Sequence, residues 1–456
     1  MRTLLSIALL LPAAPAMAAP LTLDDALVEA ARANPDLRLA RAQADSAGVD
    51  RSASWAGVLP RLDLAAAFGR DFIGAQRKVS TVPVGVDPST GATLFDQVAV
   101  NTPARDFPDY SLGLALQLPL FDGARSWNGI ARAGALARAA DRDLDETRLG
   151  VAFEVTRRFY ELVKAEESLR VLEETVGRSE ELVRRADALY AAGRGPKSDT
   201  YAARVNLQND RIAVETQRAR VAQSRADLSI ALGRSAEAAL SVVPPAPVAG
   251  PGLPGAGEPP PEEALMERAR KSRPLLASRA EASRAADLGV SVAKGAWWPV
   301  IGAQASYSRQ GPILTGSDGV YGDPSRQYVA NAQIYLQWNL FQGRKTLTDQ
   351  ESAEIQARRA RVLAEQAEQQ VSAEIARARA SLLALSRSAA LALESLSAAE
   401  QGVALARQRL EVGAANQLEV RDASLKLTQA KLSLVNARVD TVVARADLSR
   451  AIGGAL

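Results

Sequence analysis

The chain has 456 residues, of which 47% are hydrophobic, and its 55 basic side chains nearly balance its 52 acidic ones. A formal net charge of only +3 lacks the concentrated positive field that phosphate binding needs, so we expect no nucleic-acid partner. Cysteine and histidine are both absent, which excludes disulfides, thiol nucleophiles, the usual zinc ligands and histidine-based acid–base catalysis, so we expect no enzyme activity, no metal site and no cofactor.

The N-terminus has the pattern of a secretory signal peptide. Arg2 precedes an apolar segment from Leu4 to Leu11, and a run of small residues ends at Ala16-Met17-Ala18. We therefore expect export and removal of residues 1–18. Elsewhere the sequence shows no apolar run of about 18 residues, so we expect no transmembrane helix, and any membrane span would have to be β.

The rest of the chain is an internal duplication. Arg225–Gly233 returns as Arg445–Gly453, at an offset of 220 residues (445 minus 225). We predict a first structural repeat at 19–240 and a second at 262–456, joined by a proline- and glycine-rich linker at 241–261.

Near its start, each repeat has a helical pattern that follows a proline break. In the first repeat, helical patterns run over about 24–33 and 36–56 and are separated by Asn34-Pro35. In the second, the counterpart runs over about 275–296 after Arg273-Pro274. The residue before a proline disfavours helix, so we expect real breaks at these positions.

A pair of β-strands follows in each repeat. We expect strands at about 61–72 and 110–121 in the first repeat and at about 300–309 and 328–341 in the second. Every second residue from Leu112 to Leu120 is leucine, with small or polar residues and Pro119 between them. This period of two predicts one apolar face for lipid and one polar face. Aromatic residues in or beside the strands are candidates for an interfacial belt: Tyr110, Tyr307, Tyr335, Trp297, Trp298 and Trp338.

The first repeat carries an insertion between its strands. Pro60 matches Pro299 at an offset of 239 residues (299 minus 60), which is larger than the offset of the later segments. Residues 82–86 and 94–100 flank the turn-forming sequence Asp87–Gly91, so we expect a small extra hairpin within residues 73–109.

A Leu-Phe-x-Gly motif marks a strand-to-helix junction in each repeat. Its residues are Leu120, Phe121 and Gly123 in the first repeat, and Leu340, Phe341 and Gly343 in the second. The periodicity changes there from two to helical. We expect Leu120 and Leu340 to be the last lipid-facing residues, with the chain leaving the membrane at this point.

A long helical hairpin follows each junction, at about 124–232 and about 344–452. No proline lies between Ala124 and Ala192, and a helix of that length would reach roughly 100 Å. Each hairpin turns near a glycine, Gly193 or Gly413. Apolar and small residues recur at alternating spacings of three and four, which predicts coiled-coil packing: Leu169, Leu172, Val176, Ser179, Val183, Ala186 and Tyr190, and later Ala389, Ala392, Leu396, Ala399, Val403, Ala406 and Leu410.

Four strands cannot close a membrane-spanning sheet, because single-chain barrels begin at about eight strands. Two chains would supply eight strands and three would supply twelve. An eight-stranded barrel is filled by its own side chains, whereas the polar face here suits a water-filled lumen, with Gln117, Gln333, Gln337 and Asn339. The pattern therefore favours three chains and leaves two open.

Together the signal peptide, the duplicated strand pairs, the Leu-Phe-x-Gly junctions and the glycine-containing hairpin tips resemble the outer membrane efflux protein (TolC) family of Gram-negative bacteria. The resemblance covers essentially the whole mature chain. It implies a mainly α fold with a small β part, in which duplicated coiled-coil hairpins form a periplasmic α-barrel. Four strands per chain would then contribute to a trimeric 12-stranded β-barrel in the outer membrane.

The resemblance also implies a function and partners. The chain would be the passive exit duct of a tripartite efflux pump or a type I secretion system. A homotrimer would sit in outer membrane lipid, dock a periplasmic adaptor (membrane fusion) protein, and receive substrates from an inner-membrane pump of the RND, MFS or ABC type.

In such ducts the carboxylates just after the tips line the periplasmic aperture, which matches Asp199, Glu419 and Asp422. Glu419 and Asp422 are three residues apart and share a helix face. Acids in a first helical turn can alternatively serve only to complement the helix dipole. The resemblance gives the tips a second role as adaptor contacts, at Gly193, Arg194, Gly195, Gly413, Ala414 and Ala415.

The aperture of such ducts is often closed by an arginine or an aromatic residue, where this sequence has Ala415 and Leu410. Arg194, Lys197 and Arg421 are the candidates to replace that lock. A rival hypothesis is a periplasmic coiled-coil scaffold or adaptor without a membrane barrel, which would explain the helices but not the leucine-rich strand.

Overall fold

The computed structural model describes residues 21–236, 240–243 and 258–454. The predicted signal peptide at 1–18 and most of the predicted linker at 241–261 lie outside these residues. The chain divides into two compact units. The first draws its described residues from Met1–Gly48, Ala135–Ser283 and Arg359–Leu456, and the second is made of Val49–Gly134 and Arg284–Arg358. Each unit therefore combines segments of both sequence repeats.

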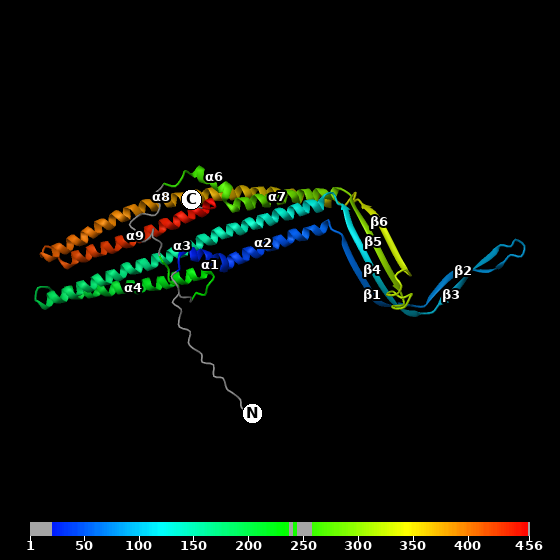
Figure 1. Cartoon of the computed structure of the whole chain (residues 1–456), viewed down its shortest axis with the longest axis horizontal. Coiled ribbons are helices and arrows are strands. Elements are labelled where there is room, and N and C mark those ends of the chain that lie inside the picture. The colour runs from blue at the N-terminus through cyan, green and yellow to red at the C-terminus, as the bar shows by residue number, and fades with distance from the viewer. Residues whose placement is uncertain (1–20, 237–239, 244–257, 455–456) are drawn as a thin grey trace, which may run out of the picture. The chain divides into compact units, whose positions relative to one another are not determined.

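The fold is mainly helical with a small β part. The long hairpins are α3 (Arg125–Ala191) with α4 (Lys197–Leu232), and α8 (Lys345–Glu411) with α9 (Gln417–Ile452) (Figure 1). The shorter helices are α1 (Leu23–Ala33), α2 (Pro35–Ala53), α6 (Glu262–Ser272) and α7 (Pro274–Lys294). Asn34 and Arg273 stand at the predicted breaks, and α6 is a helix that the sequence pattern did not predict.

Heptads hold the hairpins together. In α4 every seventh residue is buried, at Thr200, Leu207, Val214, Val221 and Leu228. In α9 the same positions of the second repeat are buried, at Val420, Leu427, Leu434, Thr441 and Leu448. A strict seven-residue repeat is the signature of coiled-coil packing, which explains why helices this long form pairs.

Two apolar cores use equivalent positions of the two repeats. In the first, Val155 of α3 and Leu228 of α4 pack in one cluster with Ala26 of α1. In the second, Ile375 of α8 and Leu448 of α9 pack in another cluster with Leu265 of α6. The offsets that align the two sequences therefore also align the two cores.

α8 is the one helix in the described part of the chain that is long and apolar enough to cross a membrane, by length and composition only. No such helix is expected from the sequence. At 67 residues α8 is about 100 Å long, roughly three times the hydrocarbon thickness of a bilayer. Its buried residues pack against α6 and α9, so we interpret it as one arm of a coiled-coil hairpin.

The strands form an antiparallel sheet in the order β1-β4-β5-β6. They are β1 (Arg61–Ile73), β4 (Arg105–Phe121), β5 (Val300–Gly311) and β6 (Tyr328–Gln337). The hairpin predicted in the insertion is present as β2 (Gln76–Val86) and β3 (Thr93–Thr102), with longer strands than predicted. Figure 1 shows this ribbon continuing from β1 and β4.

The strand predicted at about 328–341 is shorter in the structure and ends at Gln337. Its last partner is Val300, the first residue of β5, so the chain beyond Gln337 has no strand to pair with. The other junction differs because β4 lies between two strands and pairs as far as Phe121, across a bulge after Pro119. Leu340 and Phe341 are therefore outside the strand, so the predicted end of this strand at about residue 341 is wrong.

The sheet has one apolar and one polar face. The pairing register brings Leu64, Leu114 and Tyr307 to one side, with Ala330 of β6. On this side many large apolar side chains are exposed: Leu62, Leu64, Phe68, Phe72, Leu114, Leu116, Ile334 and Leu336. The other side carries Gln117, Gln304 and Gln333 in one row. The amphipathic pattern predicted from the sequence thus extends across all four strands.

The aromatic residues lie at two levels of this unit. Phe68 packs against Tyr110 and stacks on Tyr321, and Tyr307 stacks on Tyr328, all toward the loop ends of the strands. All five tryptophans of the chain lie beside the helical ends of the strands: Trp55, Trp127, Trp297, Trp298 and Trp338. Tyr335 instead lies over Gly302 on the polar face, so it is not part of a belt on the apolar face.

Both strand-to-helix junctions use two successive residues in the left-handed conformation. They are Gly123 (φ 69°) with Ala124 (φ 62°), and Gly343 (φ 57°) with Arg344 (φ 70°). A side chain on Gly123 would collide with the Gly295 carbonyl and with Trp298, whereas one on Gly343 would meet open space. Gly123 is therefore required by both conformation and crowding, and Gly343 by conformation alone.

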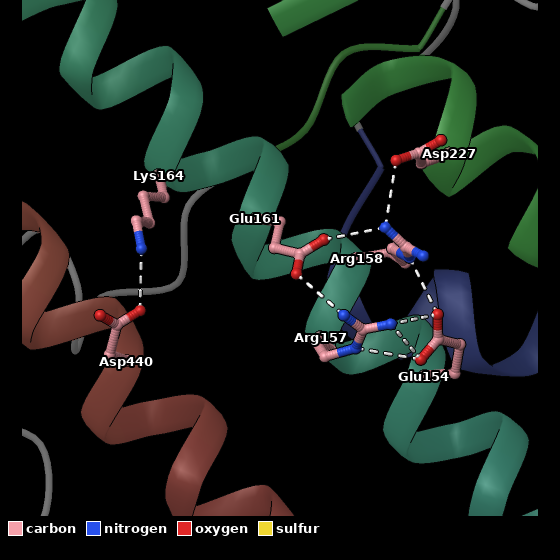
Figure 2. Close-up of polar contacts among 7 residues, drawn as sticks. All are labelled: Glu154, Arg157, Arg158, Glu161, Lys164, Asp227 and Asp440. Carbon is pink, nitrogen blue, oxygen red and sulfur yellow. Dashed lines mark hydrogen bonds and ion pairs between the residues drawn. The ribbon is translucent and has the colours of Figure 1, made fainter. Parts of the chain in front are cut away.

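Ion pairs tie α3 to α4 and α9. Arg158 of α3 lies 3.1 Å from Asp227 of α4, and Lys164 of α3 lies 2.9 Å from Asp440 of α9 (Figure 2). Burial alone would raise the pKa of the Glu154 carboxyl, but hydrogen bonds from Arg157 and Arg158 outweigh it and lower the pKa.

A more deeply buried cluster lies at the break between α6 and α7. The Arg273 side chain is 1% exposed, and its guanidinium lies 2.7 Å from Glu146 of α3 and 3.3 Å from Glu374 of α8. It also donates to the Arg450 carbonyl of α9. Burial raises the pKa of the Glu146 carboxyl, although the charge of Arg273 opposes this. One side chain therefore ties the break to three long helices.

Substituting the junction glycines should separate conformation from crowding. Gly343→Ala should destabilise the protein by about 1–2 kcal/mol, the cost of a left-handed non-glycine residue. Gly123→Ala should cost more because the added Cβ also collides with Gly295 and Trp298. Thermal denaturation of the detergent-solubilised protein measures both, and equal losses would contradict the crowding argument.

Glu146→Gln and Glu154→Gln should change the pH dependence of folding stability in opposite directions. Because the folded pKa of Glu146 is raised above about 4.5, wild-type stability relative to E146Q should rise as pH falls from neutral toward 4.5. Because the pKa of Glu154 is lowered, wild-type stability relative to E154Q should fall as pH drops below about 4.5. Chemical denaturation over a pH series tests this, and parallel curves for the two variants would refute it.

Candidate functional site

Each long hairpin ends in a tight turn closed by a left-handed glycine. At the first tip, Gly193 (φ 66°) follows α3, and the Arg194 amide donates to the Leu189 carbonyl at 2.8 Å. At the second, Gly413 (φ 76°) follows α8, and the Ala414 amide donates to the Arg409 carbonyl at 2.8 Å. This is how glycine commonly terminates a helix.

The predicted adaptor-contact residues are all at these turns. Four are exposed, and Gly195 and Ala415 are half-buried: the full set is Gly193, Arg194, Gly195, Gly413, Ala414 and Ala415. The two tips differ in chemistry. The first carries Arg194 and Lys197, and the Lys197 ammonium lies 5.7 Å from the centre of the Tyr201 ring. The second has no charge between Val412 and Asn416 and exposes Val412 and Leu418.

Glu419 and Asp422 lie together beside a groove between α8 and α9 of about 700 Å³. Each has a cationic partner. The Glu419 carboxylate lies 2.5 Å from the Arg409 guanidinium of α8, and Asp422 lies 2.7 Å from Lys426 on its own helix. Glu419 also has its amide capped by the Asn416 side chain at 3.0 Å. The predicted anionic pair is therefore largely compensated within one chain.

Asp199 lies in a different groove, of about 370 Å³, between the two hairpins. In the part of the chain that the structure describes, its carboxylate forms no ion pair and accepts only a long hydrogen bond, 3.4 Å, from the Ser198 hydroxyl. The structure thus brings Glu419 and Asp422 together and separates Asp199 from them.

A buried ion pair joins the hairpins below this groove. The Arg421 guanidinium of α9 lies 2.7 Å from the Asp210 carboxylate of α4, and the two side chains are only 11% and 12% exposed. The Ser179 hydroxyl of α3 donates to Asp210 at 2.5 Å and accepts from Arg421 at 2.9 Å. Of the cations considered as a replacement lock, Arg421 is the one that bridges the hairpins.

The same interface continues away from the tips. The hydroxyls of Thr175 on α3 and Thr428 on α9 are 2.9 Å apart, and Arg178 donates to both. Farther along, the Lys431 ammonium lies 2.6 Å from the Glu174 carboxylate. Polar groups therefore hold the two hairpins together over several helical turns.

Sequence reasoning missed Arg409, Asp210 and Ser179 as members of this site. Arg409 could have been found, because residues at equal distances from a hairpin turn face each other and Arg409 mirrors Glu419 across Ala414. Asp210 and Ser179 meet Arg421 only because separate hairpins pack together. Among the residues that the structure describes, no group of three or more acidic residues is arranged to hold a metal ion.

The family model for outer membrane efflux proteins matches residues 26–234 and 265–454. The chain belongs to the outer membrane efflux protein family, whose members are transport channels rather than enzymes. Among curated protein sequences, none matches the chain.

Solved structures share the fold. A membrane protein from Pseudomonas aeruginosa is 21% identical with a TM-score of 0.77, covering 94% of this chain and 93% of that one. The Campylobacter jejuni CmeC outer membrane channel is 17% identical with a TM-score of 0.74, covering 95% and 85%. The open state of the Neisseria gonorrhoeae MtrE outer membrane channel is 18% identical with a TM-score of 0.74, covering 95% and 89%.

Arg421→Met should destabilise the protein by about 3–5 kcal/mol, because it leaves the Asp210 charge buried without a partner. Arg409→Met, which breaks a more exposed pair, should cost at most about 1 kcal/mol. Adding Asp210→Asn to Arg421→Met should recover part of the loss. Chemical denaturation measures all three, and similar losses for Arg421→Met and Arg409→Met would contradict a special role of the buried pair.

Proposed function

We propose that the chain is the outer-membrane exit duct of a tripartite efflux pump or a type I secretion system. Three copies form a passive channel, and energy comes from other components. One observation carries the proposal: a member of the outer membrane efflux protein family exposes many large apolar side chains on one face of a four-stranded sheet.

The exposed face is suited to lipid. Leu64 and Leu62 are 69% and 68% exposed, and Ile334 is 73% exposed, far more apolar surface than a sheet shows to water. Pairing in the described chain leaves β1 and β6 at the edges. In lipid an open edge is too costly, so copies must join edge to edge. Three copies give twelve strands, with the glutamine-rich face toward a wet lumen.

The helical hairpins suit a passage through the periplasm. At about 100 Å, α3 and α8 exceed what any membrane span requires. Their tips would dock a periplasmic adaptor, which links the duct to an inner-membrane pump of the RND, MFS or ABC type. On this proposal residues 1–18 direct export, and the duct resides in the outer membrane of a Gram-negative bacterium.

The gate of the duct lies at the hairpin tips. Asp199, Glu419 and Asp422 would surround the periplasmic aperture, and Arg421 with Asp210 would hold the closed arrangement. This pair supports the proposal because it joins α9 of one hairpin to α4 of the other, so the hairpins cannot separate without breaking it.

Planar-bilayer recording of the purified protein tests the channel. We expect discrete conductance steps, and a silent bilayer with correctly folded protein would count against the duct.

Fractionation tests the rival hypothesis of a periplasmic scaffold or adaptor. A scaffold should wash off membranes with salt or carbonate, whereas the proposed duct should need detergent.

The ion preference of the channel should depend on Arg409. Arg409→Ala frees the Glu419 carboxylate and should raise the cation-to-anion permeability ratio, and Glu419→Gln should lower it. Reversal potentials in a salt gradient give the ratio. Arg204→Ala, which removes an exposed arginine paired with Asp187 on the first hairpin, is the control and should leave it unchanged. An unchanged ratio in both Arg409→Ala and Glu419→Gln would remove Glu419 from the aperture.

A further inference from the structure

The groove of about 370 Å³ between the hairpins has the size and lining of a small-molecule site. Binding sites for small molecules usually enclose roughly 300–1,000 Å³ and combine apolar walls with a few polar groups. Here the apolar walls include Leu182 of α3, Ala203 of α4 and Leu418 of α9. The polar groups include Asp199 and Asn206 of α4 and Gln417 of α9.

The charges that line the groove favour a positively charged ligand. Asp199 is a half-buried carboxylate that forms no ion pair in the described structure and is weakly bound by Ser198 at 3.4 Å. Arg421 also lines the groove, but its charge is already matched by Asp210 at 2.7 Å. The carboxylate therefore remains as the uncompensated charge. One carboxylate beside amides does not suit a divalent metal, which prefers several charged oxygens.

We infer that this groove binds a small organic cation, with an amidinium, guanidinium or primary ammonium group on Asp199 and a short apolar body against Leu182 and Leu418. A planar amidinium or guanidinium can donate two parallel hydrogen bonds to a carboxylate. The amide oxygens of Asn206 and Gln417 offer further acceptors.

Occupancy of the groove stabilises the packed arrangement of the hairpins. Its walls come from α3 and α4 of the first hairpin and from α9 of the second, so a bound ligand contacts both only while they are together. A ligand that binds one arrangement better shifts the population toward it. On the proposed function, this would make the ligand an inhibitor of opening, but binding itself does not depend on that function.

The matched probes are benzamidine and benzamide, which share a shape and differ in charge. With the detergent-solubilised full chain, calorimetric titration should show benzamidine binding at least about tenfold more tightly than benzamide. Asp199→Asn should bring the affinity for benzamidine down to about that for benzamide and so remove this preference. Glu411→Gln, which removes an exposed carboxylate outside the groove, should keep the preference.

Hydrogen exchange on the same samples locates the site and checks folding. Benzamidine should slow amide exchange in the first turns of α4 and α9 of the wild type but not of Asp199→Asn, whose exchange elsewhere should match the wild type. Equal binding of the two probes, a preference that survives Asp199→Asn, or protection confined to other segments would overturn the inference. Each of these outcomes leaves the conductance test of the proposed duct unaffected.

Discussion

The backbone at the two edges of the four-stranded sheet needs hydrogen-bond partners, and this requirement governs the rest of the structure. A sheet with an apolar outer face belongs in hydrocarbon, where an unpaired amide or carbonyl costs several kcal/mol. Because β1 and β6 are the edges in the described chain, the sheet would need further strands to pair with them in hydrocarbon. The helices depend on a different constraint. Their buried seven-residue repeats, which include Leu207 and Leu427, specify coiled-coil packing in pairs.

The duplication preserves packing more strictly than it preserves charge. The carboxylates Glu154 and Asp227 of the first repeat return as Glu374 and Asp447 in the second. The arginine that pairs with these carboxylates comes from a different helix in each repeat. Arg158 of α3 pairs with both carboxylates of the first repeat, and Arg450 of α9 pairs with both carboxylates of the second. An apolar seam tolerates little change in volume, whereas a long arginine can reach a carboxylate from several positions.

The hairpin tips have diverged in the same way. Both turns keep a left-handed glycine because backbone geometry demands it, at Gly193 and Gly413. Their side chains do not match. Asp199 is left without a cationic partner in the described structure, whereas its counterpart Glu419 is paired with Arg409. Among the described residues, the two matching hairpins thus place a carboxylate without an ion pair in one groove and a paired carboxylate in another.

The sequence by itself determined the elements that depend on local periodicity. Alternation from Leu112 to Leu120 predicted a strand with one apolar face, the seven-residue spacing predicted coiled coils, and Asn34-Pro35 and Arg273-Pro274 predicted breaks, because each signal acts within a few residues. Tertiary structure decided what depends on partners distant in sequence. β6 ends at Gln337 because Val300 begins β5, and Arg421 meets Asp210 because two hairpins pack together, which no local pattern encodes.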